Sequence, residues 1–98
     1  MKVLITTQYS ENYGTESDPY WKFKGGSDYF IQNVNPLNVA PGMLVDKVRS
    51  QIEYSNPMSQ ELILDWELVS DDFITEFEKD QLEFGGKIVY PTKVIELA

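Results

Sequence analysis

The chain contains neither cysteine nor histidine, so no disulfide bond and no zinc site built from these side chains can hold its fold. Its stability must therefore come from the burial of apolar side chains. Hydrophobic residues make up 42% of the 98 residues. That fraction is enough for one modest core, and we expect a single domain over residues 1–98.

The missing side chains also restrict the chemistry open to the protein. Histidine is the usual general base near neutral pH, and cysteine supplies the thiol nucleophiles. Without them, only carboxylate, lysine or tyrosine chemistry is left. We therefore expect a protein that is not an enzyme and carries no cofactor.

Alternation of apolar and polar residues predicts strands in three parts of the chain. Residues 2–9 place Val3, Ile5 and Thr7 on one face, and their apolar first half suits an interior strand. A strand over residues 61–69 alternates with one exception, Ile63. Its predicted core face carries Leu62, Leu64, Trp66 and Leu68. A last strand is predicted over residues 87–97, broken or bent at Pro91.

Residues 20–33 are predicted to form a hairpin closed at Gly25-Gly26 or Gly26-Ser27, because glycine provides the positive φ angles of tight hairpin turns. Both registers leave the same side chains on each face. The predicted core face carries Trp21, Phe23, Phe30 and Gln32. The opposite face carries Tyr20, Lys22, Lys24, Tyr29 and Ile31.

Two segments have helical patterns. In the first, Arg49 and Glu53 form an i, i+4 pair, and the apolar positions are Leu44, Val45, Val48 and Ile52. In the second, Thr75 and Glu78 match a capping box, and Gly85-Gly86 ends the helix. Its predicted inner side carries Phe77, Gln81 and Phe84. The fold class is α+β, a mainly antiparallel sheet with one longer and one short helix packed on one side.

Charge is distributed unevenly along the sequence. Residues 53–83 hold ten acidic residues and one base, Lys79, so this segment has a net charge of −9. The other residues sum to +1, which gives the whole chain its net charge of −8. Such a chain repels nucleic acid and anionic membranes, and a protein with a basic surface is its natural partner. The candidate partner-binding residues are Asp65, Glu67, Asp71, Asp72, Glu76, Glu78, Asp80 and Glu83. Two other interpretations are a solvated surface and a mimic of DNA phosphates.

The same sequence offers two weaker candidate sites. A calcium loop starting at Asp65 fails, because Val69 and Ser70 occupy a ligand position and the glycine position, so no metal site is predicted. The alternative function is a small-ligand or nucleotide site in which lysines grip a phosphate and tyrosines stack on a base. Its candidate residues are Tyr13, Tyr20, Lys22, Lys24 and Tyr29.

The stretch Thr7-Gln8-Tyr9-Ser10-Glu11-Asn12-Tyr13-Gly14, followed by residues 20–26, resembles the start of small uncharacterised proteins encoded by tailed bacteriophages. The resemblance covers about the first third of the chain. It implies an accessory or anti-defence factor that binds a host protein in the host cytosol. A cytosolic location also fits the apolar runs, which are too short for a signal peptide or a membrane span. A homodimer is a further possibility that the sequence leaves open.

Overall fold

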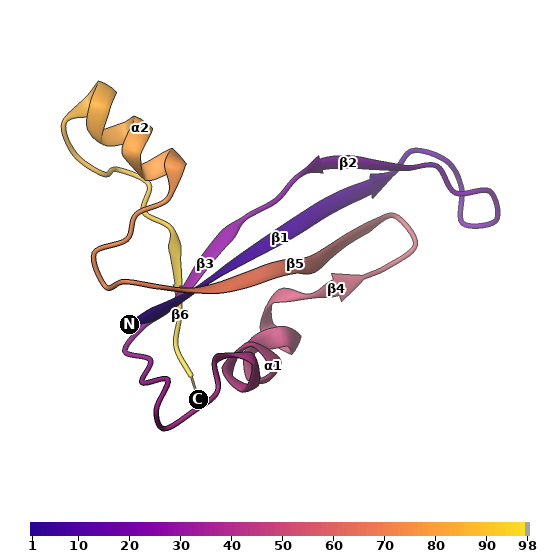
Figure 1. Cartoon of the computed structure of the whole chain (residues 1–98). Coiled ribbons are helices and arrows are strands. Elements are labelled where there is room, and N and C mark those ends of the chain that lie inside the picture. The colour runs from indigo at the N-terminus through magenta and orange to yellow at the C-terminus, as the bar shows by residue number, and fades with distance from the viewer. Residues whose placement is uncertain (98) are drawn as a thin grey trace.

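The computed structural model describes residues 1–97 and contains one curled sheet with two helices (Figure 1). The elements follow one another along the chain as β1 (Lys2–Asn12), β2 (Trp21–Gly25), β3 (Asp28–Ile31), α1 (Pro41–Ile52), β4 (Tyr54–Ser55), β5 (Ser59–Val69), α2 (Glu76–Gly85) and β6 (Lys93–Ile95). The predicted α+β class is confirmed.

Strand β1 lies at the centre of the sheet. The strands are ordered β4-β5-β1-β3-β6, and β2 also pairs with β1. Every pair is antiparallel except β3 with β6, so the sheet is mainly antiparallel as predicted. The interior position expected for residues 2–9 is confirmed, and β1 continues three residues further, to Asn12.

The predicted hairpin over residues 20–33 is wrong. Strands β2 and β3 both pair with β1, β3 along Val3–Thr6 and β2 along Tyr9–Asn12, so they follow one another along the same edge (Figure 1). Between them the chain bends tightly against Thr7, whose Oγ1 accepts the backbone N–H of Ser27 at 2.9 Å. A Cβ on Gly26 would overlap the backbone oxygen of Thr7. The glycine therefore permits a close approach rather than a hairpin turn.

The predicted core face of β5 is also partly wrong, because the strand contains a bulge. Thr6 pairs with Asp65 but Thr7 pairs with Ile63, which leaves Leu64 as an extra residue. The alternation therefore changes phase at this point. Ile63 packs against the main core, whereas Leu62 and Leu64 are exposed.

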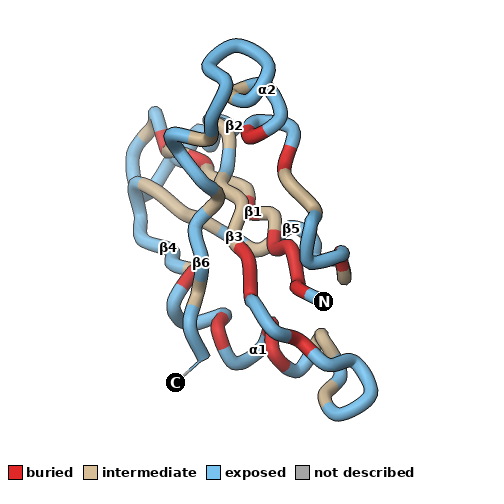
Figure 2. The backbone as a smooth tube through the Cα atoms, turned by 90° about the vertical axis from the view of Figure 1, so that its left-hand side faces the viewer, coloured by how far each residue is buried: buried red, intermediate tan, exposed pale blue. Residues whose placement is uncertain are grey.

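The main core lies between one face of the sheet and α1. Its buried members are Val3, Ile5, Ile31, Val34, Leu44, Val45, Val48 and Ile52. The four helix positions predicted from their spacing are all among them, and the helix begins at Pro41, whose missing N–H costs nothing in the first turn. Figure 2 shows buried stretches on β1, β3 and α1.

A smaller cluster lies on the opposite face of the sheet. It consists of Leu4, Phe30 and Val69, and Phe73 packs against it with its ring edge-on to Phe30. Lys2 places its Nζ 3.9 Å from the centre of the Phe30 ring. Trp21 and Phe23, predicted to be core residues, are exposed, because β2 pairs with β1 beyond this cluster.

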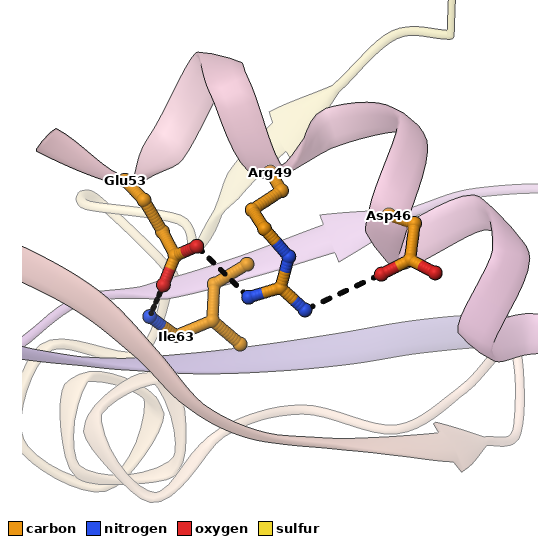
Figure 3. A network of polar contacts seen from close by, with 4 residues as sticks. All are labelled: Asp46, Arg49, Glu53 and Ile63. Atoms are coloured by element: carbon orange, nitrogen blue, oxygen red, sulfur yellow. Dashed lines mark hydrogen bonds and ion pairs between the residues drawn. The ribbon is translucent and has the colours of Figure 1, made fainter.

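A hydrogen bond from Ile63 to Glu53 connects the end of α1 to the outer edge of β5 (Figure 3). Arg49 donates to Glu53 Oε1 at 2.8 Å, which confirms the predicted pair, and to Asp46 at 3.3 Å. The other carboxylate oxygen of Glu53 accepts the backbone N–H of Ile63 at 2.9 Å. Strand β4 follows directly, and Asn56 closes the turn into β5 by accepting two backbone N–H groups.

Helix α2 has the predicted start and end but an unexpected position. Its capping box between Thr75 and Glu78 is formed, and Gly86 ends it in the left-handed conformation. Figures 1 and 2 both show α2 at the opposite end of the molecule from α1. Phe77 and Phe84, predicted to face inward, are exposed. The predicted last strand is reduced to Lys93–Ile95.

Candidate functional site

The predicted acidic residues lie in three successive parts of the chain: strand β5, the turn after it and helix α2. Asp65 and Glu67 lie on the sheet face opposite α1, since they pair with Thr6 and Leu4. Asp71 and Asp72 follow in the turn after β5, where Asp71 contacts the N-terminal amino group at 3.1 Å. Three further carboxylates lie exposed on α2, those of Glu76, Asp80 and Glu83.

Glu78, one of the predicted partner-binding residues, is buried and is not part of the exposed surface of α2. Its side chain is buried and accepts hydrogen bonds from Thr75 N, Thr75 Oγ1 and Thr92 Oγ1 at 2.9–3.1 Å, and from Thr92 N at 3.4 Å. Burial raises the pKa of this carboxyl, but the hydrogen bonds from Thr75 and Thr92 outweigh burial and hold the pKa below its ordinary value. Glu78 joins α2 to the segment that leads into β6.

The exposed face of α2 has two adjacent stripes. Glu76, Asp80 and Glu83 are spaced i, i+4, i+7 and therefore lie along one line of the helix. The next line carries Phe77, Gln81 and Phe84 at the same spacing. Phe77 is 59% exposed and Phe84 is 86% exposed, which is unusual for two phenylalanines on one helix face. We call these two stripes together the α2 face.

A shallow apolar hollow of about 390 Å³ lies beside the phenylalanine stripe. Gln81 holds the following segment against the helix, because its amide accepts the backbone N–H groups of Val89 and Tyr90 and donates to the Tyr90 oxygen. The hollow is lined by Phe77, Gln81, Phe84, Gly85, Lys87, Val89 and Tyr90. Val89 and Tyr90 were not predicted as site residues, since the sequence pattern places both in a strand over residues 87–97.

The alternative site is brought together only in part. The Nζ atoms of Lys22 and Lys24 lie 5.9 and 5.1 Å from the centre of the Tyr13 ring, within the range of cation–π attraction. Hydrogen bonding to Tyr13 raises the pKa of Lys24. Tyr20 is close by, since its backbone oxygen accepts from Tyr13 N at 2.9 Å. Tyr29 lies elsewhere, beside Lys93 and against the main core.

All members of this cluster are exposed, so they form an open surface rather than an enclosed site. Within residues 1–97, no group of three or more acidic side chains is arranged to hold a metal ion. The helices in this part of the chain are too short and too polar to cross a membrane. The α2 face is thus the most developed candidate site, because it combines apolar side chains, a hollow and a charged border.

Comparison with known proteins adds no assignment to this geometry. No protein-family model matches the sequence, and no curated protein or solved structure was found to be similar to it.

Proposed function

We propose that this is a non-enzymatic binding protein that inserts the α2 face into an apolar groove of another protein. The observation that carries the proposal is the exposure of Phe77 and Phe84 beside the acidic stripe of α2. Helices that dock into grooves present apolar anchors along one face at positions such as i, i+4 and i+7, and Phe77 and Phe84 occupy the first and last of these positions. The partner groove is expected to be bordered by lysine or arginine side chains.

The energetic roles of the two stripes differ. Burying a phenylalanine side chain contributes roughly 1.5–3 kcal/mol, so Phe77 and Phe84 are the expected anchors of affinity. Carboxylates at the border contribute more to the rate of association and to the choice of a basic partner than to affinity. The resemblance to phage-encoded proteins supports a host protein as this partner.

A photo-crosslinking amino acid in place of Phe84 tests the proposal in lysate of a bacterial host. We expect it to capture one protein, and the same crosslinker in place of Leu37, which is 93% exposed far from α2 in sequence, to capture none. Capture by the Phe84 probe should disappear when Glu76, Asp80 and Glu83 are all replaced by lysine. A charge-matched control replaces Glu16, Asp18 and Asp46 by lysine and should leave capture unchanged.

The experiment has a clear negative outcome. If both probes capture the same proteins, or if the charge-matched control loses capture as completely as the α2 variant, the α2 face is not the binding surface. Rising salt should also reduce capture, because contacts between exposed charges are screened.

A second candidate function is binding of a nucleotide or other small anionic ligand beside Tyr13. The two ammonium groups near the Tyr13 ring favour it. A thermal-shift screen against nucleotides tests this candidate, because a ligand that binds the folded state raises the melting temperature as it saturates the site. Replacement of Lys22 and Lys24 by alanine should remove any such shift.

A further inference from the structure

The sheet face opposite α1 is divided into a charged half and an uncharged half. Asp28 and Asp65 both pair with Thr6, and Glu67 pairs with Leu4, so the charged half surrounds the first part of β1. The second part of β1 continues beyond Thr7 toward Asn12. There the same face carries no charged side chain in any of the three strands.

The strand register defines the uncharged half. Gln8 lies opposite Leu62, Ser10 lies between Phe23 and Gln60, and Asn12 lies opposite Trp21. We call this set the neutral face, and its members are Gln8, Ser10, Asn12, Trp21, Phe23, Gln60 and Leu62. On the other side of the same strands lie Glu11, Lys22 and Glu61, so the lack of charge belongs to one face only.

The apolar side chains of the neutral face are only partly covered by the rest of the chain. Phe23 is 63% exposed, Leu62 is 42% exposed and Trp21 is 39% exposed. Apolar side chains gathered on one sheet face in this way are typical of an interaction surface. A sheet face is commonly covered by a second sheet, packed face to face.

We propose that the neutral face is covered by a second copy of the chain, in a dimer with two-fold symmetry. In such an interface each residue near the axis meets its own copy, so a charged side chain there would face a like charge. Two molecules with a net charge of −8 each repel one another, and an uncharged contact surface adds nothing to this repulsion at short range.

The position of the charges on the rest of this face agrees with a second copy. When two neutral faces overlap about a two-fold axis, their acidic halves can point in opposite directions, away from one another. A partner of opposite charge would instead be expected to meet acidic groups within its contact surface. The dimer leaves the α2 face free, so this inference does not depend on the proposed function.

Sedimentation velocity over a range of protein concentrations tests the dimer. We expect a monomer–dimer equilibrium that shifts toward dimer as salt is raised, because salt screens the repulsion between the two copies. Phe23→Glu and Leu62→Glu should each give a monomer at every concentration. Leu37→Glu adds the same charge at a site 93% exposed and outside the neutral face, and it should dimerise like the wild type.

Thiol cross-linking provides a second measurement, since the wild-type chain has no cysteine. Phe23→Cys should form covalent dimers rapidly with a short thiol-specific cross-linker, and Leu37→Cys should not. A wild-type protein that is monomeric up to its solubility limit would overturn the proposal. So would equal cross-linking of the two cysteine variants, or dimers of Phe23→Glu and Leu62→Glu as stable as those of the wild type.

Discussion

Glu53 Oε2 accepts the backbone N–H of Ile63 at 2.9 Å, at a point where β5 pairs with β1 on one side and, in the described part of the chain, with no strand on its outer side. Strand β4 pairs with β5 only at Gln60 and Glu61, so the outer edge of β5 is open beyond Glu61. Asp65 accepts the N–H of Trp66 at 2.8 Å further along this strand. Since free strand edges invite pairing with other chains, these carboxylates protect the edge.

Replacing Glu53 should therefore lower stability through the Ile63 amide as well as through Arg49. We expect Glu53→Ala to lower the free energy of unfolding by about 1 kcal/mol or more, because it leaves a backbone donor without its partner. Glu53→Gln keeps an acceptor at this position and should cost less. Chemical denaturation followed by circular dichroism measures both changes.

The control for Glu53 is Asp46, the other acidic partner of Arg49. Asp46→Asn should change the free energy of unfolding very little, since the ion pair of Asp46 with Arg49 is well exposed to solvent. An equal loss in Asp46→Asn and Glu53→Ala would mean that the amide contact contributes nothing.

Glu78 should make the free energy of unfolding depend on pH in the acid range. Its folded-state pKa lies below the ordinary value of 4.5, so its contribution is fully present above pH 4.5 and is lost as the pH falls through the lowered pKa. We expect the difference in unfolding free energy between the wild type and Glu78→Gln to shrink as the pH is lowered below 4.5. Denaturation curves recorded from pH 7 down to acid pH test this.

Glu76 is the matched control for the loss of a carboxylate from the same helix, because its side chain is 88% exposed. At pH 7, Glu76→Gln should lower the free energy of unfolding much less than Glu78→Gln. A gap for Glu78→Gln that stays constant at all pH values would contradict the assignment of the titrating group to Glu78.

Because of the bulge in β5, we expect alanine substitutions of two adjacent residues to differ in their effect on stability. Ile63 packs against the main core and Leu62 is exposed, although alternation alone predicts the reverse. Ile63→Ala should lower the free energy of unfolding by about 2 kcal/mol, and Leu62→Ala by less than about 1 kcal/mol. Measurements in dilute protein keep any association through the neutral face out of the comparison. Equal losses would mean that the strand keeps a regular register.

The sequence predicted those parts of the fold that depend on local chemistry. The capping box at Thr75 and Glu78 was identified because both partners lie within one turn, and Val45 and Val48 were assigned to the core from helical spacing. The bulge at Leu64 was missed because a single inserted residue alters the register without altering the composition.

The candidate site was predictable to a smaller degree. The acidic residues of α2 stand out by charge, but the sequence does not say that Phe77 and Phe84 face solvent. Their orientation follows from tertiary placement, since α2 lies beyond the edge of the sheet and the core is closed without it. The same pattern on a helix packed against the sheet would have made them core residues.

Replacing Gly26 or Gly85 by alanine should change the free energy of unfolding in opposite directions. A Cβ on Gly26 would overlap the backbone oxygen of Thr7, and a backbone atom cannot move aside without breaking the hydrogen bonds that hold the bend between β2 and β3. Gly26→Ala should therefore lower the free energy of unfolding by roughly 1–3 kcal/mol. A Cβ on Gly85, the last residue of α2, would meet no atom within 4 Å. Gly85→Ala should raise stability by about 0.5–1 kcal/mol, because alanine favours the helix. If chemical denaturation found Gly26→Ala as stable as the wild type, the close approach of Gly26 to Thr7 would be refuted.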